Sequence, residues 1–139
     1  VGSLIGYEGE IAILSATTDA PDQNTWIAAM VNALETDPKY ANMELVATVY
    51  GDDEPQKSTT EAEALLQTYP DLRGIISPTT VGVAAAAQVL QSAGRADEVI
   101  LTGLGTPNQM RPFIKDGTVE AFQLWSPYNQ GWLAAHFAV

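Results

Sequence analysis

The stretch that decides the fold is GEIAILSATTDAPDQNTWIAAMVNALE, residues 9 to 35. It opens with a short apolar run, Glu10–Ser15, that is typical of a buried strand. A polar loop follows, and Gln23–Glu35 then places apolar side chains at i, i+4, i+7 and i+8, one face of a helix. The apolar positions of that face are Trp26, Met30, Ala33 and Leu34. The stretch therefore predicts a strand, a long loop and a helix in succession.

The same alternation continues along the chain. Further strands are predicted at Glu44–Tyr50, Arg73–Ser77, Glu98–Gly103 and Thr118–Trp125. Further helices are predicted at Gln56–Tyr69, Thr80–Ala93 and Pro107–Lys115, and Gly94 and Gly117 lie where two of them should end. Strands that alternate with helices indicate parallel crossovers. The predicted fold class is α/β, a three-layer, doubly wound, mainly parallel sheet of five strands.

Composition narrows the range of partners. At 139 residues the chain fits one domain with a substantial core. Its net charge of -11, with no cluster of Lys or Arg, repels phosphate backbones, so we expect no nucleic-acid partner. Without cysteine, neither disulfides nor thiolate chemistry are available. The longest apolar runs, such as Val81–Ala87, are far shorter than a membrane span.

The two ends of the chain resemble connections more than finished elements. VGSLIGYEG, residues 1 to 9, reads as a connector into the first strand and lacks the basic start and apolar centre of a signal peptide. NQGWLAAHFAV, residues 129 to 139, begins another apolar-striped helix that stops without a cap. We therefore expect this sequence to be one lobe of a longer protein.

Polar and aromatic side chains follow the predicted strands. In an open parallel sheet, ligands bind outside the carboxyl ends of the strands, at the switch point in strand order. The expected ligand-binding residues at that edge are Asp22, Gln23, Asn24, Trp26, Pro78, Thr79, Thr80, Gly105, Thr106 and Trp125. This set holds amides, hydroxyls, a carboxylate and indoles but no Lys or Arg, which favours a neutral, hydroxyl-rich ligand.

Each of these residues also has a purely structural interpretation. Asp22 precedes an apolar-periodic run and is a good candidate for a helix N-cap. Trp26 falls on the apolar face of its helix, where it would serve core packing alone. Thr79 or Thr80 would cap the following helix, and Trp125 would pack beneath the chain as it leaves the domain. The functional interpretation depends on their shared position at one edge of the sheet.

The sequence gives little support for a catalytic, metal-binding or cofactor-binding site. The single histidine, His136, lies in the terminal apolar segment, away from the strand ends, so a Ser-His-Asp arrangement lacks its base. GDDEP, residues 51 to 55, lacks the spacing of a calcium loop and is interpreted as a solvated acidic turn. GLGTPN, residues 103 to 108, lacks the third glycine of a dinucleotide fingerprint. We expect no catalytic residue, no metal ligand and no cofactor.

Three motifs together carry a family resemblance. DQNTW (residues 22–26), SPTTVG (77–82) and GLGTPNQMR (103–111) resemble the type I periplasmic sugar-binding proteins of ABC importers. Within that family they are most similar to rhamnose-binding proteins, with autoinducer-2-binding proteins as near relatives. The resemblance implies two α/β lobes joined by a hinge, of which this chain is the carboxyl-terminal one. On that basis residues 1–125 form the sugar-binding lobe, and residues 126–139 cross the hinge and begin a helix of the missing amino-terminal lobe.

The resemblance also assigns ligand contacts. An Asp-Gln pair holds ligand hydroxyls in the autoinducer-2 relatives, and here that pair would be Asp22 and Gln23. A Pro and the residue two positions beyond supply further contacts, here Pro78 and Thr80. The relatives have Asp-Ala after that Pro where this chain has two threonines, which favours rhamnose over autoinducer-2. Ribose-type members place an Asp where this chain has Gly105, which argues against ribose.

The implied function is solute capture without chemistry. A small neutral sugar, rhamnose or a similar one, would be held between the two lobes and delivered to an ABC permease in the membrane. The implied location is the periplasm, although no signal peptide is present in this stretch. An autoinducer-2-binding relative and the sensor lobe of a ribose- or lactose-type transcriptional repressor remain alternatives. A flavodoxin- or Rossmann-type enzyme would need a phosphate-binding glycine after the first strand, and SATTDAPDQ has none.

Overall fold

The computed structural model describes residues 1–124 and 126–137 of the chain. Its elements, in chain order, are β1 (Glu8–Ser15), α1 (Pro21–Thr36), the short 3-10 helix η1 (Pro38–Tyr40), β2 (Asn42–Tyr50), α2 (Pro55–Thr68), β3 (Leu72–Ser77), α3 (Thr80–Ala93), β4 (Ile100–Gly105), α4 (Pro107–Lys115), β5 (Gln123–Leu124) and α5 (Pro127–Phe137). None of the helices in these residues is both long and apolar enough to span a membrane.

One five-stranded sheet organises the described residues. Its order is β2-β1-β3-β4-β5, and each pair of neighbours is parallel. β1 lies inside the sheet, and its residues from Ile11 to Ser15 are all buried, as expected for a strand covered on both faces. The chain leaves β1 to one side for β2 and then returns across it to β3, so the order reverses between β1 and β3. The predicted α/β, doubly wound architecture is confirmed.

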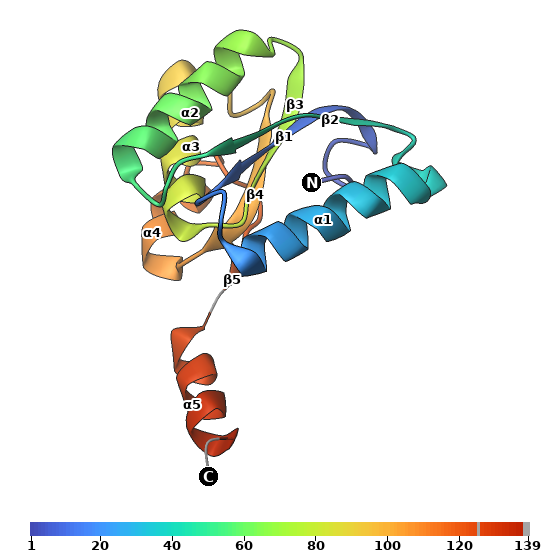
Figure 1. Ribbon diagram of the computed structural model, residues 1–139. Coiled ribbons are helices and arrows are strands. Elements are labelled where there is room, and N and C mark those ends of the chain that lie inside the picture. Colours follow the sequence, from blue (N-terminus) through green and yellow to red (C-terminus); the bar gives the residue numbers. More distant parts are fainter. Residues whose placement is uncertain (125, 138–139) are drawn as a thin grey trace.

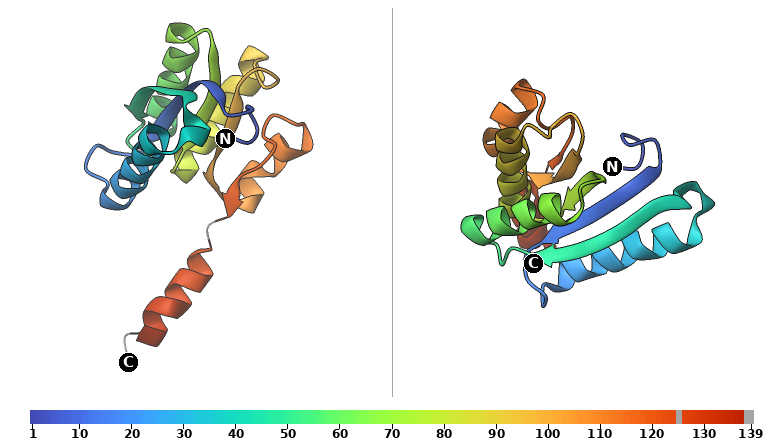
Figure 2. Two further views of the ribbon diagram at one scale, coloured as in Figure 1. Left: turned by 90° about the vertical axis from the view of Figure 1, so that its right-hand side faces the viewer. Right: turned by 90° about the horizontal axis from the view of Figure 1, so that it is seen from above.

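The helices divide unequally between the two faces of the sheet. α2, α3 and α4 cover one face and α1 covers the other, as Figures 1 and 2 show. Under α3 the core is continuous, because small side chains such as Ala86 and Ala87 let the helix lie close to Ile75 and Leu101 of the sheet. This face supplies most of the buried apolar surface of the domain.

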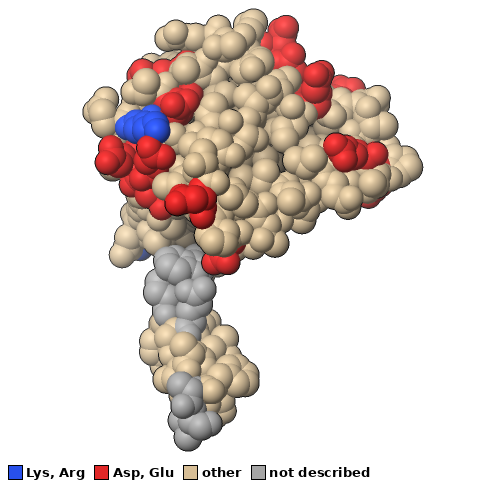
Figure 3. Space-filling model, viewed as in Figure 1, with Lys and Arg blue, Asp and Glu red and all other residues tan. Residues whose placement is uncertain are grey.

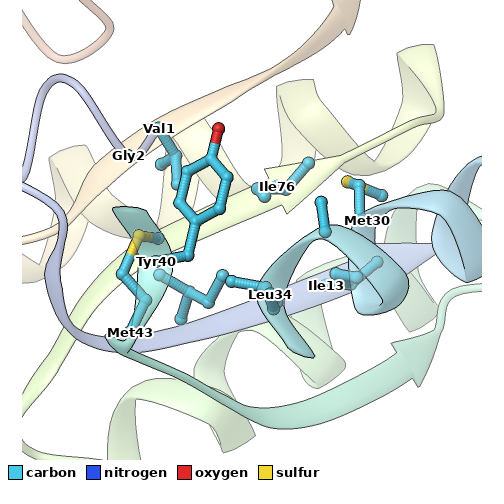
Figure 4. Close-up of a pocket in the computed structure, with 10 residues that line it drawn as sticks. Val1, Gly2, Ile13, Met30, Leu34, Tyr40, Met43 and Ile76 are labelled. Carbon is cyan, nitrogen blue, oxygen red and sulfur yellow. The ribbon is translucent and has the colours of Figure 1, made fainter. Parts of the chain in front are cut away.

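α1 covers its face loosely. No residue of α1 is buried, and Trp26, predicted as a possible core residue, is 45% exposed. An apolar cavity of about 180 Å³ lies between this helix and the sheet, and Figure 4 shows Met30 and Leu34 of α1 facing Ile13 and Ile76 across it. The remaining lining residues are Val1, Gly2, Ile11, Ala33, Tyr40 and Met43.

The fifth strand is shorter than predicted. The segment Thr118–Trp125 was expected as a strand, but the described strand is only Gln123–Leu124. Thr118 instead donates from its backbone N–H (3.0 Å) and its hydroxyl (2.7 Å) to the carboxylate of Asp116, and the N–H of Val119 bonds to the carbonyl of Phe113 at 3.0 Å. These bonds close the end of α4, so the backbone at 118–119 is used in a turn. Trp125 lies outside the described residues.

α5 extends away from the sheet (Figure 1). It exposes large apolar side chains, among them Tyr128 at 80% and Phe137 at 80%, while Trp132 stacks on His136 with ring centroids 5.0 Å apart. The assignment of residues 126–139 to a hinge and a second lobe stays a prediction.

Candidate ligand-binding site

A cleft of about 580 Å³ lies at the carboxyl edge of the sheet. It is formed by the segments that follow β1 and β3, the two strands between which the order reverses, where ligands bind in open parallel sheets. The lining residues are Ala20, Pro21, Asp22, Gln23, Trp26, Asp53, Pro78, Thr79, Thr80, Val81 and Leu104. Six of the ten residues predicted from sequence therefore meet in one cleft.

A second hollow, of about 410 Å³, continues this cleft toward β4 and β5. Trp26, Pro78 and Leu104 line both spaces, so the indole lies between them. The second hollow also includes Thr102 of β4 and Gln123 of β5. Together the two spaces form an open groove, which leaves one side of any occupant uncovered by this chain.

Gln23 stabilises the first wall of the cleft, which is formed by the start of α1. Its side-chain carbonyl accepts hydrogen bonds from the hydroxyl of Ser15 at 2.6 Å and from the backbone N–H of Ala16 at 2.8 Å. These bonds orient the amide and use its acceptor, which leaves the NH2 group as the part able to donate to a ligand. The predicted contact is thus restricted to a donor role.

Asp22 is not the N-cap of α1, contrary to one interpretation of the sequence. Pro21 occupies the first helical position, which suits a residue without an N–H, so Ala20 becomes the N-cap and makes no side-chain capping bond. Asp22 lies in the first turn, where the helix dipole favours a negative charge. Its carboxylate lines the cleft instead of closing the helix end.

Asn24 is not among the residues that line the cleft, and its role as a site residue stays a prediction. Its side-chain NH2 donates to the backbone carbonyl of Thr18 at 2.9 Å, in an exposed position. This bond ties the first turn of α1 to the loop that precedes the helix.

The second wall is the turn between β3 and α3. Thr79, one of the two predicted candidates, is the N-cap of α3, and its hydroxyl accepts the N–H of Val81 at 3.3 Å. Gly82 permits a close approach here, because a Cβ at this position would lie 2.5 Å from the hydroxyl oxygen of Ser77. Ser77 in turn donates to the carbonyl of Leu14 at 2.8 Å, which ties the end of β3 to β1. Thr80 is half-buried and lines the cleft.

Asp53 is the lining residue that sequence reasoning missed. The segment GDDEP was interpreted as a solvated acidic turn, yet the carboxylate of Asp53 accepts a hydrogen bond from the hydroxyl of Thr79 and lines the cleft. The available signal was its position after β2, because β2 pairs in parallel with β1 and ends at the same edge of the sheet. The ten predicted site residues all follow or end the other four strands.

Two predicted site residues lie elsewhere. Gly105 is buried within β4, where a Cβ would lie 2.6 Å from the Cγ of Met110 and 2.9 Å from the ring of Phe122. β4 continues two residues beyond its predicted end, so this glycine serves packing against α4. Thr106 is the N-cap residue of α4, and its hydroxyl lies 3.4 Å from the side-chain oxygen of Gln109. Neither lines the cleft, and Trp125 is outside the described residues.

The chemistry of the lining favours a neutral ligand. It combines two carboxylates, an amide, two hydroxyls and an indole, and none of the described lining residues is Lys, Arg or His. Carboxylates accept from hydroxyl groups and repel anions, and an indole face covers apolar C–H groups. Acidic side chains also predominate on the face seen in Figure 3. Across residues 1–124 and 126–137, no group of three His, Cys, Asp or Glu is arranged to hold a metal ion.

This geometry agrees with a known family. A family described as "Periplasmic binding protein domain" matches residues 1–139. The chain belongs to the periplasmic binding protein family. The family resemblance that the three motifs predicted is thereby confirmed, and the sheet corresponds to one lobe of its type I fold.

Individual members of the family give finer comparisons. The structure of a sugar ABC transporter from Actinomyces odontolyticus is 52% identical with a TM-score of 0.87, over 91% of this chain and 40% of that one. An ABC transporter solute binding protein from Clostridium phytofermentas, solved with bound L-rhamnose, is 40% identical with a TM-score of 0.92, over 97% of this chain and 43% of that one. A D-ribose/D-allose-binding protein of Pseudomonas aeruginosa is 29% identical over 113 residues, 81% of this chain and 33% of that protein. The chain thus spans less than half the length of each.

Proposed function

We propose that this chain is the carboxyl-terminal lobe of the solute-binding component of an ABC-type sugar importer, and that the full-length protein binds L-rhamnose or a similar small neutral sugar. Residues 1–125 would form the lobe, and residues 126–139 would lead through the hinge into the amino-terminal lobe. The function is capture and delivery to a membrane permease, without a chemical step. The proposed location is the periplasm.

The observation that carries this proposal is the composition of the cleft at the switch point. Asp22 presents a carboxylate acceptor and Gln23 an amide donor on one wall, while Thr80 presents a hydroxyl on the other. Trp26 offers a flat apolar surface between the two hollows. A pyranose has hydroxyls around its rim and apolar C–H groups on its faces, so it matches both kinds of group. The relative solved with L-rhamnose makes that sugar the first candidate.

The open groove suggests how a second lobe would strengthen ligand binding. A ligand held by this lobe alone keeps one side in water, so each hydrogen bond competes with solvent. Closure of a second lobe over the groove would exclude that water and strengthen the same bonds. The closed form, which exists mainly with ligand bound, would then be the form that the permease recognises.

Isothermal titration calorimetry of the full-length protein tests this proposal. L-rhamnose should bind with a measurable heat, and L-fucose, ribose, xylose and autoinducer-2 serve as competitors that would reassign the ligand within the family. The chain of residues 1–139 alone should bind the same sugar far more weakly, because it supplies one wall. Absence of binding by every sugar in the full-length protein would contradict the proposal.

Asp22→Ala gives the residue-level test. Loss of a charged acceptor for sugar hydroxyls should weaken binding by about 1.5–3 kcal/mol, roughly 10- to 150-fold in Kd. Asp19→Ala is the matched control, because Asp19 is an exposed carboxylate in the same loop that does not line the cleft. Equal affinities for the two variants would remove Asp22 from the binding site.

A further inference from the structure

Two adjacent carboxylates in the β2–α2 turn are used in different ways. Asp52 and Asp53 both have left-handed backbone conformations, with φ of 54° and 53°. Such conformations are uncommon outside glycine, and Asp and Asn tolerate them best. Two in succession turn the chain sharply, and this turn adjoins the cleft. A sharp, non-glycine turn beside a binding site invites a functional explanation.

The backbone of this turn is held firmly. The N–H of Gly51 bonds to the carbonyl of Ser15 at 2.9 Å, and the N–H of Asp52 bonds to the carbonyl of Ala16 at 2.8 Å. Gly51 also lies against α2, where a Cβ would come within 2.9 Å of the Cα of Ser58. The backbone of the turn is therefore fixed to the end of β1 and to the start of α2.

The two side chains have different partners. The carboxylate of Asp52 pairs with the ammonium of Lys57 at 2.5 Å, and both side chains are exposed, at 45% and 42%. The hydrogen bond to Asp52 raises the pKa of Lys57 above its ordinary value. The carboxylate of Asp53 instead accepts the hydroxyl of Thr79 and lines the cleft.

The hydrogen bonds of Thr79 decide which residue is available to a ligand. A threonine hydroxyl has one proton, and that of Thr79 is donated to Asp53, while its oxygen already accepts the N–H of Val81. Thr79 is also only 5% exposed. Asp53 uses one carboxylate oxygen in this bond, so its second oxygen is left to accept from the cleft.

We infer that Asp53 is a ligand-contacting, specificity-determining residue of the cleft and that Thr79 is its positioning residue. This inference rests on the proposed function and names the part of the lobe that selects the ligand. The ligand class is a neutral sugar with a hydroxyl donor opposite each of two carboxylates, Asp22 and Asp53. A sugar acid places its own carboxylate among these groups and is rejected by repulsion.

Calorimetry of the full-length protein with L-rhamnose and with D-galacturonate tests the inference. Asp53→Ala should weaken rhamnose binding by at least about tenfold, the value of one charge-assisted hydrogen bond. Asp53→Asn keeps a residue that tolerates the left-handed conformation and should narrow the gap between rhamnose and galacturonate. Asp52→Ala, the adjacent carboxylate with the same backbone conformation, should bind rhamnose as the wild type does.

The positioning role has its own readout. Thr79→Val removes the hydroxyl and should weaken rhamnose binding, while Thr79→Ser keeps it and should restore the affinity. In an Asp53→Ala background, Thr79→Val should cost little further affinity, because the bond that it supports is already gone. Melting temperatures of each variant separate lost folding from lost binding.

The outcomes distinguish this inference from the proposed function. If wild-type protein binds rhamnose and Asp53→Ala binds it equally well, the inference is overturned while the proposed function stands. If the losses from Thr79→Val and Asp53→Ala are additive, the positioning role of Thr79 is overturned. If the wild type binds neither rhamnose nor another sugar of the panel, the proposed function itself fails.

Discussion

The two faces of the sheet differ in how firmly they are covered. α3 buries seven of its residues against the sheet, Gly82, Val83, Ala85, Ala86, Ala87, Val89 and Leu90. α1 buries none and leaves an apolar cavity beneath it. The cleft lies where these two regions meet, since Trp26 comes from α1 and Thr80 from α3. One wall of the site is therefore supported by a close-packed layer, and the other by a helix that has an unfilled apolar cavity beneath it.

The substitution with the largest expected effect on the free energy of unfolding is Leu90→Ala in α3. Leu90 is fully buried, so the truncation leaves a cavity in a close-packed layer and should lower the free energy of unfolding by about 2–5 kcal/mol. Urea denaturation measures the change. Leu133→Ala, the same truncation at a residue 45% exposed in α5, is the control and should cost less than about 0.5 kcal/mol. Similar losses for both variants would mean that the α3 face is not a close-packed core.

Hydrogen exchange compares the two helices directly. Amides of α1 should exchange through local opening at a free energy roughly 2 kcal/mol or more below that of α3, because few buried contacts hold α1 in place. Native-state exchange followed by NMR or mass spectrometry gives both values in one experiment. Equal protection in the two helices would remove the distinction between the faces.

Leu34→Ala in α1 should have a smaller effect than its counterpart in α3. Leu34 is half-buried and borders the existing cavity, so less apolar area is returned to water and the expected loss is about 1 kcal/mol. The same urea titration checks this value. A loss as large as that of Leu90→Ala would show that α1 is packed as tightly as α3.

The smallest effect on the free energy of unfolding is expected from a change at Asp116, whose carboxylate links the end of α4 to α3. Hydrogen bonds from the backbone and hydroxyl of Thr118 lower the pKa of its carboxyl, and Gln91 of α3 donates to it at 2.5 Å. Because the folded-state pKa is depressed, the carboxylate stabilises the fold at neutral pH. That contribution is lost as the pH falls below about 4 and through the lowered value.

Asp116→Asn measures this contribution. The variant should be slightly less stable than the wild type at pH 7, and the difference should vanish at the acid end, where the wild-type carboxyl is protonated. Urea titrations at pH 7, 4 and 2.5 give the comparison. A difference that does not change with pH would assign the effect to something other than the charge.

The sequence was most informative where local chemistry and tertiary structure agree. α3 was predicted with its observed limits, because Thr79 is a true N-cap and Gly94 takes the left-handed conformation at the C-cap. The strands next to it were recognised from their apolar runs. Placing Asp22, Gln23 and Thr80 at one edge required only that the strands be parallel, and the cleft contains all three.

The structure departs from the sequence-based interpretation where side chains and backbone groups compete for positions, which a linear pattern does not show. Asp22 is not the N-cap, because α1 starts at Pro21, two residues before the predicted start at Gln23, and Ala20 takes the capping position. The amide of Asn24 found a nearer partner in the carbonyl of Thr18. The sequence did not indicate Asp53 as a site residue, because acidic turns are typically exposed to solvent. The hydrogen bond between Asp53 and Thr79 joins segments that are far apart in the sequence.

The hydrogen bonds of Gln23 and Asn24 have a consequence for how fast a ligand would bind under the proposed function. They hold the loop after β1 in one shape before any sugar arrives. A solute that meets this wall does not wait for a loop to order, and little conformational entropy is lost on contact. Under the proposed function we therefore expect first contact with this lobe to need no ordering step, and discrimination between sugars to be expressed in how quickly they leave.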